Sequence, residues 1–231
     1  AAGVLLDFDG SLADIVARPE LAPPGDGARE VLVALVERYA LVGILTGRRS
    51  DEIVAVLDVP GLRSYGLYGL EGNAPEPVTG VVRSVEAAAT AIPRAWVEDK
   101  GVSIAVHYRQ APDPAAARSA LLAALRPVAA GSGLELIEGK MVVELVPPGR
   151  PMKGGAIERL AGEHALQAVV YAGDDHADLD AFAALDRLRS GGLVTVKVAV
   201  RGVETPPALV HAANLVVEEP AGLVELLRQL A

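Results

Sequence analysis

The sequence predicts an α/β fold in which a parallel sheet is covered by helices on both faces and is interrupted by a smaller α+β unit. Short runs of Val, Leu and Ile alternate with amphipathic helical stretches in the first and last parts of the chain, a pattern typical of buried parallel strands. The segment between Pro75 and Pro151 has a different rhythm, with alternating strands and Pro-containing ends. Acidic residues follow two of the apolar runs, at the sheet edge where such folds bind ligands.

The N-terminal part contains the first two expected strands. Residues 4–8 form one apolar run and residues 41–45 form another. Between them, apolar residues recur on one helical face over residues 26–39. Ser50 is expected to cap a following helix, whose acidic first turn suits the helix dipole. A short strand is expected at residues 65–68.

The middle segment predicts a compact α+β unit. Its expected elements are helices at 86–96 and 114–129 and strands at 102–108, 134–137 and 141–146. Short links between such elements allow one small core of their own. We therefore assign residues 75–150 to an inserted cap domain over the active site, and residues 1–74 with 151–231 to the catalytic core.

The C-terminal part resumes the rhythm of the beginning and completes the parallel sheet. Its expected elements are helices at 153–164, 178–185 and 221–230 and strands at 168–172, 194–199 and 215–217. Because ligands of open parallel sheets lie at the carboxyl ends of the strands, the residues that follow these strands are the candidates for function.

Composition excludes several classes of protein. With 231 residues the chain can form one large domain or a core with an insert. Its formal net charge is −9 and it lacks a long basic stretch, so we expect no nucleic-acid partner. The absence of Cys excludes disulfides and thiolate metal sites. No apolar run reaches about 18 residues without a break, so we expect a monomeric cytoplasmic protein with no membrane partner.

The most informative local feature is the pair of carboxylates Asp7 and Asp9 after the first strand. Positions i and i+2 of an extended strand point to the same side, so the two side chains are expected to crowd together. Two like charges at that range repel, and a divalent cation or a shared proton would relieve the repulsion. The pair therefore predicts a metal-dependent site at a strand end.

A second acidic group follows the strand at 168–172, in the run Gly173-Asp174-Asp175-His176-Ala177-Asp178. Either acidic group alone is equally compatible with turn and cap chemistry. Two groups at two strand ends together favour an oxygen cage for Mg²⁺. Thr46 at the end of the second strand could hold a phosphate oxygen, and Lys153 could neutralise its charge, although a simple turn and a solvated lysine explain each of them alone.

The order DxDG(S/T), Thr at a strand end, Lys and then GDDxxD resembles the haloacid dehalogenase superfamily of phosphotransferases over the whole chain. More narrowly, the chain resembles trehalose-6-phosphate phosphatases in the segments LDFDGSLADI (6–15), LTGR (45–48), EDKGVSIAVHYR (98–109), GKMVVEL (139–145), the run at 153–156 and GDDHADLDAF (173–182). The resemblance implies a Rossmann-like core with an α+β cap.

The resemblance also implies roles for the residues of the core. Asp7 would be the nucleophile that forms an aspartyl-phosphate, and Asp9 the general acid and then the base. Thr46 and Lys153 would hold the transferring phosphoryl group. The implied Mg²⁺ ligands are Asp7, Asp174 and the backbone carbonyl of Asp9. The residues implied for outer-shell roles are Asp175 and Asp178.

Polar residues of the insert are candidates for sugar recognition. They stand among apolar strand residues and comprise Lys100, His107, Arg109, Lys140 and Glu144. Glu144 is the best supported, because it interrupts the run at 141–146, whereas for His107 and Arg109 a solvated strand face is the more common explanation. Glu71 at the link into the insert is a further candidate, and Arg48 is expected to touch the substrate or to pin the core to the cap.

Departures from the family pattern leave alternatives open. The family has Thr, Glu and His where Ala177, Leu179 and Tyr68 stand, which leaves the implied chemistry intact but makes the substrate less certain. The expected function is Mg²⁺-dependent hydrolysis of trehalose 6-phosphate, a small-molecule sugar phosphate. The alternatives are a phosphatase of another sugar or pseudo-disaccharide phosphate, such as sucrose phosphate or mannosyl-3-phosphoglycerate, and a weakly active homologue that binds a sugar phosphate.

Overall fold

A computed structural model describes residues 1–16, 18, 22–69, 78, 80–149 and 152–231. The chain divides into two compact units, a core unit of Ala1–Glu71 with Pro151–Ala231 and an inserted unit of Gly72–Arg150. The inserted unit therefore begins at residue 72 rather than at the expected residue 75, and ends at residue 150. Each unit has its own hydrophobic core.

The core unit is built on a six-stranded sheet with strand order β10-β9-β8-β1-β2-β3, in which every pair is parallel. The strands are β1 (Ala2–Leu6), β2 (Leu41–Leu45), β3 (Arg63–Tyr65), β8 (Ala168–Gly173), β9 (Val194–Arg201) and β10 (Leu215–Glu218). From β1 the chain adds strands first on one side and later on the other. The strand order therefore reverses between β1 and β8, and such a switch point is where open parallel sheets bind ligands.

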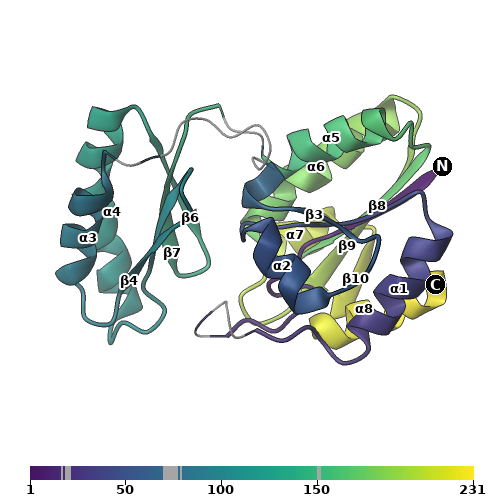
Figure 1. The fold of residues 1–231 in the computed structure, drawn as a ribbon, viewed down its shortest axis with the longest axis horizontal. Helices are drawn as coiled ribbons and strands as arrows, with labels where there is room; N and C mark the ends of the chain where they lie inside the picture. Colours follow the sequence, from purple (N-terminus) through teal and green to yellow (C-terminus); the bar gives the residue numbers. More distant parts are fainter. Residues whose placement is uncertain (17, 19–21, 70–77, 79, 150–151) are drawn as a thin grey trace. The chain divides into compact units, whose positions relative to one another are not determined.

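Helices cover both faces of this sheet (Figure 1). One face packs against α1 (Ala28–Arg38), α2 (Ser50–Leu57) and α8 (Glu219–Leu230), and the other against α5 (Lys153–Glu163), α6 (His176–Ser190) and α7 (Pro207–Ala212). Within β1, Val4 and Leu6 face the first group of helices whereas Leu5 faces the second. Burial of both faces explains why these strands are continuously apolar instead of alternating.

The inserted unit is an antiparallel sheet covered on one face by two helices. The sheet has the strand order β4-β5-β7-β6. Its elements are α3 (Val82–Thr90), β4 (Trp96–Asp99), β5 (Ile104–His107), α4 (Pro114–Ser132), β6 (Glu135–Gly139) and β7 (Val142–Val146). Ile104 and Val106 of β5 pack with Val143 and Leu145 of β7 in the core shared with the helices. The alternate residues lie on the opposite face of the sheet.

The expected helix at 86–96 is wrong, because α3 ends at Thr90 and β4 begins at Trp96. Pro93 disfavours the helical conformation at the residue before it, and Arg94 has a φ of 64°. The unit therefore contains four strands rather than the three expected. The expected helix overlaps α3 only over residues 86–90.

Three further expectations need correction in the core unit. The strand expected at 4–8 is β1 at Ala2–Leu6 and ends two residues earlier. The strand expected at 65–68 ends at Tyr65 and is followed by a 3₁₀ turn at Leu67–Gly69, where Tyr68 has a φ of 59°. Ser50 does not cap α2, because its hydroxyl donates to the carbonyl of Ser64 at 3.1 Å and Arg49 is the N-cap. Helix α7 was not predicted, since it has only six residues, Pro207–Ala212.

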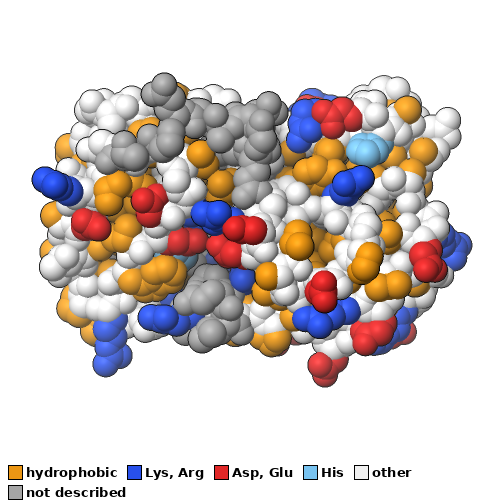
Figure 2. Space-filling model, in the orientation of Figure 1, with side chains coloured by type: hydrophobic (Ala, Val, Ile, Leu, Met, Phe, Trp, Pro, Cys, Tyr) orange, Lys and Arg blue, Asp and Glu red, His pale blue; other side chains and the backbone are white. Residues whose placement is uncertain are grey.

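On the face drawn in Figure 2, the described Lys and Arg side chains lie among Asp and Glu side chains rather than forming one continuous positive area. Among the residues that the structure describes, no helix has the length and apolar character needed to cross a membrane.

Candidate active site

The carboxyl ends of three neighbouring strands carry the predicted core residues. Asp7 follows β1, Thr46 follows β2 and Asp174 follows β8. The backbone amide of Asp7 donates to the carbonyl of Ala172 at 2.9 Å, which extends the parallel ladder to the base of the site. All three polar side chains are buried, so each needs partners that replace water.

Lys153 supplies the positive charge of the site. It is the first residue of α5, and its Nζ donates to Oδ1 of Asp7 and to Oδ1 of Asp178, both at 2.7 Å. Lys153, Asp7 and Asp178 are each at most 5% exposed. The predicted nucleophile and the predicted phosphate-binding lysine are therefore in direct contact inside the core unit.

The carboxylate of Asp178 receives four hydrogen bonds. Besides Lys153, the hydroxyl of Tyr171 donates to Oδ1 at 2.6 Å, and the amides of Asp174 and Asp175 donate to Oδ2 at 2.8 Å each. Burial opposes ionisation, but the charge of Lys153 and these hydrogen bonds hold the pKa of Asp178 below its usual value. Asp178 therefore acts as a fixed anion that orients Lys153.

The pKa of Asp7 is shifted in the opposite direction to that of Asp178. Burial raises its pKa well above the usual value, Lys153 opposes this, and the carboxylates of Asp178 and Asp174 raise it further. Burial lowers the pKa of Lys153, but the anions Asp178 and Asp7 outweigh burial and raise it. Lys153 is therefore charged at neutral pH, and the site has more buried carboxylates than cations.

The excess of carboxylates defines a candidate metal centre. Among the described residues, one carboxylate oxygen from each of Asp7, Asp174 and Asp178 lies within 4.8 Å of the others. Gly10, at a φ of 86°, brings its backbone so close to Asp174 that a Cβ there would stand 2.0 Å from Oδ2. Hard carboxylate oxygens suit Mg²⁺, so these three side chains form a candidate site for that ion.

Asp9 and Arg48 form a separate pair. Arg48 Nε donates to Oδ2 of Asp9 at 2.8 Å, and its Nη2 donates to Oδ1. The guanidinium carbon lies 4.9 Å from the centre of the Phe8 ring, and the backbone amide of Arg48 donates to the hydroxyl of Thr46 at 3.1 Å. The expected crowding of Asp7 against Asp9 is thus replaced by two ion pairs, one with Lys153 and one with Arg48.

Asp175, another core candidate, has a structural role at the start of a helix. Asp175 is the N-cap of α6, where its carboxylate and that of Asp178 form a reciprocal capping box. This box explains why α6 begins at His176, two residues before the expected start. Glu71 lies outside the described residues.

Three candidates of the inserted unit come together on the face of its sheet opposite the helices. We call the group of Glu98, Lys100, Ser103, His107 and Glu144 the polar cluster. Glu144 is 3% exposed and accepts a hydrogen bond from Ser103 Oγ at 2.6 Å, with Lys100 Nζ at 3.4 Å. Glu98 lies 2.7 Å from Nε2 of His107 and 3.9 Å from Lys100 Nζ.

The other two candidates of the inserted unit lie together, at the end of the β6–β7 hairpin. Arg109 Nη2 donates to the carbonyl of Lys140 at 3.3 Å, and the amide of Tyr108 donates to the carbonyl of Met141 at 3.0 Å. These contacts hold the chain after β5 against the hairpin turn.

Within the polar cluster, His107 has an aromatic neighbour: the Trp96 ring stacks on it with a centroid distance of 4.1 Å.

Sequence reasoning missed Glu98, Ser103 and Tyr171. Glu98 could have been found by the i and i+2 rule that singled out Asp7 and Asp9, since it precedes Lys100 by two positions. Tyr171 is a hydroxyl-bearing residue in an otherwise apolar strand and is fully buried. Ser103 gave no comparable signal, because a Ser next to a Gly and Val pair is ordinary at a strand start.

The fold of the chain is that of solved haloacid dehalogenase-like structures. A haloacid dehalogenase-like hydrolase from Bacteroides thetaiotaomicron superposes with a TM-score of 0.70 at 14% identity, covering 99% of both chains. A trehalose-6-phosphate phosphatase related protein gives a TM-score of 0.74 at 24% identity, covering 99% of this chain and 96% of that one. The C-terminal domain of the Candida albicans trehalose-6-phosphate phosphatase gives 0.83 at 21% identity, covering 100% and 93%.

The family model described as trehalose-phosphatase matches residues 5–208, so the chain belongs to the trehalose-phosphatase family. The trehalose-phosphate phosphatase of Mycobacterium avium is 33% identical over 99% of this chain and 61% of its own length. An uncharacterized glycosyl hydrolase of Mycobacterium tuberculosis is 35% identical over 99% of this chain and 18% of its own length. The chain thus spans less than two thirds of the length of these curated relatives.

Proposed function

We propose that this chain is a Mg²⁺-dependent phosphatase that hydrolyses trehalose 6-phosphate through an aspartyl-phosphate on Asp7. The observation that carries the proposal is the contact of Asp7 with Lys153 beside Asp174 in the buried site after β1 and β8. Membership of the trehalose-phosphatase family supports the substrate. A carboxylate can attack an anionic phosphate only where positive charge neutralises the phosphoryl oxygens, and Lys153 together with bound Mg²⁺ would supply that charge.

In the first step, an oxygen of Asp7 attacks phosphorus, and the bond between phosphorus and the sugar oxygen breaks. Asp9 gives its proton to the leaving oxygen. In the second step water attacks the aspartyl-phosphate, Asp9 takes the proton, and phosphate leaves Asp7 free again. Lys153 and the Thr46 hydroxyl hold the phosphoryl oxygens. Arg48 donates to both carboxylate oxygens of Asp9, so it must release one of them before Asp9 carries and delivers the proton.

The donor set fits Mg²⁺, because Asp7 and Asp174 offer close carboxylate oxygens on a backbone held by the sheet. When bound, Mg²⁺ would neutralise and orient the phosphoryl oxygens. Ser11 Oγ donates to Oδ1 of Asp174 at 3.5 Å and would help to orient this ligand.

We further propose that the polar cluster of the inserted unit recognises the sugar hydroxyls. Glu98 and Glu144 accept hydrogen bonds, whereas Lys100 donates them, and a sugar hydroxyl does both. Glu144 is held on Oε1 by both Ser103 and Lys100. A buried, fixed carboxylate of this kind discriminates strongly between a hydroxyl and its absence.

The test of the function is phosphate release from a panel of trehalose 6-phosphate, sucrose phosphate, mannosyl-3-phosphoglycerate, glucose 6-phosphate and p-nitrophenyl phosphate, each with and without a chelator. Trehalose 6-phosphate should give the highest kcat/KM. If another sugar phosphate is preferred, the substrate is misassigned. If no compound is hydrolysed but trehalose 6-phosphate binds, the chain is a sugar-phosphate-binding homologue.

The Asp174→Asn variant is expected to raise the Mg²⁺ concentration needed for half-maximal turnover by at least about tenfold, because one anionic ligand becomes neutral. The measurement is phosphate release over a Mg²⁺ titration that starts from chelator-treated protein. Asp14→Asn is the control, since Asp14 is an exposed acid of the loop between β1 and α1. Unchanged Mg²⁺ dependence in Asp174→Asn would remove this residue from the metal site.

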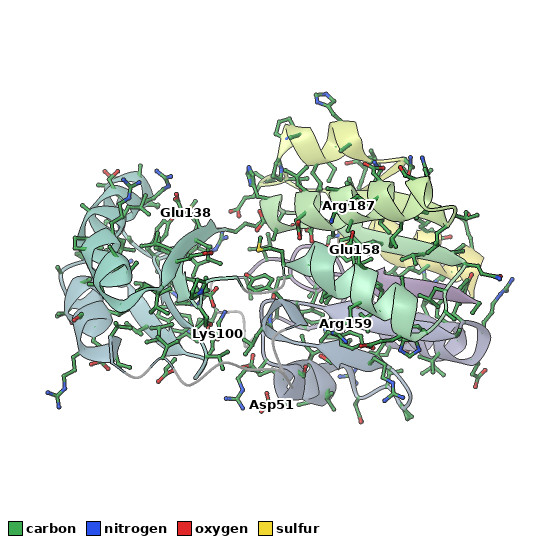
Figure 3. All side chains as sticks on the ribbon, turned by 90° about the horizontal axis from the view of Figure 1, so that it is seen from above. Asp51, Lys100, Glu138, Glu158, Arg159 and Arg187 are labelled. Atoms are coloured by element: carbon green, nitrogen blue, oxygen red, sulfur yellow. The ribbon has the colours of Figure 1, made fainter. Side chains whose placement is uncertain are left out.

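The Glu144→Gln variant is expected to raise the KM for trehalose 6-phosphate about tenfold, while kcat/KM for p-nitrophenyl phosphate, which has no sugar, stays within about twofold. The matched control is Glu138→Gln, since Glu138 belongs to β6 of the same unit but is exposed and pairs with Arg118. Figure 3 labels Glu138 together with Lys100 of the polar cluster. An equal loss on both substrates would exclude a role of Glu144 in sugar recognition.

A further inference from the structure

Helix α5 lacks a local side-chain cap although it begins at the residue that contacts Asp7. Its N-cap is Met152, which has the extended conformation usual for an N-cap (φ −77°, ψ 170°) but no oxygen to offer. The first amides of a helix have no partner within the helix and need an acceptor from elsewhere. An uncapped first turn would leave Lys153 on the least firmly held part of the helix.

Asp180 of α6 supplies the missing acceptor. Its Oδ2 accepts the amide hydrogen of Gly154 at 2.7 Å. Gly154 is the second residue of α5, and its amide is one of the two that an N-cap side chain normally binds. A carboxylate there also has the charge that a helix N-terminus favours. Asp180 therefore caps α5 from a neighbouring helix.

The close approach of the two helices requires Gly154 itself. A Cβ on this residue would stand 2.6 Å from the carbonyl oxygen of Asp180 and 2.8 Å from its Oδ2. The backbone of α6 and the start of α5 are thus in direct contact. The same helix α6 carries Asp178, which holds Nζ of Lys153.

We infer that Asp180 is a positioning residue for the reaction: it caps α5 in place of Met152 and so fixes the main chain of Lys153, while Asp178 fixes its ammonium group. The inference rests on the proposed role of Lys153 toward the phosphoryl group. Lys153 must meet phosphoryl oxygens at hydrogen-bond distance, so a shift of its main chain lowers the rate.

The Asp180→Ala variant is expected to lower kcat about fivefold to tenfold with KM within about twofold, since a lost cap loosens only the turn that carries Lys153. Asp180→Asn keeps an acceptor oxygen and should keep most of the activity. Amide hydrogen exchange in the first turn of α5 should become faster in Asp180→Ala and not in Asp180→Asn.

A local cap provides the decisive test. Met152 is 39% exposed, so Met152→Asp should be accommodated and should place an acceptor beside Gly154. The double variant Met152→Asp with Asp180→Ala is expected to recover kcat to within about twofold of the wild type. The control is Glu158→Ala, which breaks the exposed ion pair between Glu158 of α5 and Arg187 of α6 labelled in Figure 3 and should leave kcat unchanged.

Binding of orthovanadate in the presence of Mg²⁺ separates this inference from the proposed function. Asp180→Ala should weaken vanadate more than it weakens inorganic phosphate, and the double variant should restore vanadate affinity. Absence of turnover in the wild type would contradict the proposed function alone, because vanadate affinity still reports the placement of Lys153. Unchanged kcat and vanadate affinity in Asp180→Ala, or no recovery in a double variant whose first turn is again protected, would overturn the inference.

Discussion

Asp7→Asn is expected to lower kcat by about ten-thousandfold or more, because an amide cannot form the phosphoryl-enzyme. Asp178, the other carboxylate that contacts Lys153, is held by three further hydrogen bonds and is not expected to replace Asp7. The same change should not unfold the protein. Burial and the neighbouring carboxylates raise the pKa of Asp7, so above its unfolded pKa the ionised group lowers the stability of the fold. A neutral amide removes that cost.

The measurement combines phosphate release with urea unfolding at neutral pH. Asp7→Asn should have a free energy of unfolding equal to or above that of the wild type while being inactive, and it should accumulate no acid-stable phosphoprotein in a rapid quench with labelled substrate. Asp14→Asn again controls for the loss of an acidic residue. Turnover that survives in Asp7→Asn would refute the covalent mechanism.

The fold of the core unit was more predictable than that of the inserted unit for a physical reason. Strands buried on both faces must be continuously apolar, so β2 at Leu41–Leu45 was predicted to the residue. In the inserted unit one face of the sheet is polar, and β4, with the sequence WVED, has only two apolar residues, Trp96 and Val97. Its pairing with β5 makes it a strand, and pairing is not a local property of the sequence.

The site divides in the same way. Asp7, Thr46 and Asp174 could be predicted because each follows a strand, and parallel strands end at one edge. The partner of Asp9 could not, since Arg48 reaches it across the loops after β1 and β2. The roles expected for Arg48, to touch the substrate or to pin the core to the cap, stay predictions. The Asp180 contact was equally hidden, because it joins two helices whose packing the sequence does not specify.

Lys153→Met is expected to lower kcat by about a thousandfold or more and to lower the free energy of unfolding by about 3–5 kcal/mol, the usual cost of removing one partner of a buried ion pair. Asp178 is fully buried, and Lys153 is the only charged group among the hydrogen-bond donors to Asp178 in the described part of the chain. The substitution therefore leaves a buried carboxylate without a cation. Asp7 and Asp174 would then face it without a cation. Added Mg²⁺ should therefore stabilise Lys153→Met against unfolding more than it stabilises the wild type.

Lys197→Met is the matched control for this effect. Lys197 is also buried in the core unit, but its Nζ donates to Asp186 at 2.8 and 2.9 Å, and the Asp186 side chain is 55% exposed. Loss of Lys197 leaves a carboxylate that water can solvate, so kcat and the Mg²⁺ dependence of unfolding should stay near those of the wild type. Equal Mg²⁺ stabilisation of Lys153→Met and the wild type would show that Lys153 does not balance the charge of the metal-binding carboxylates.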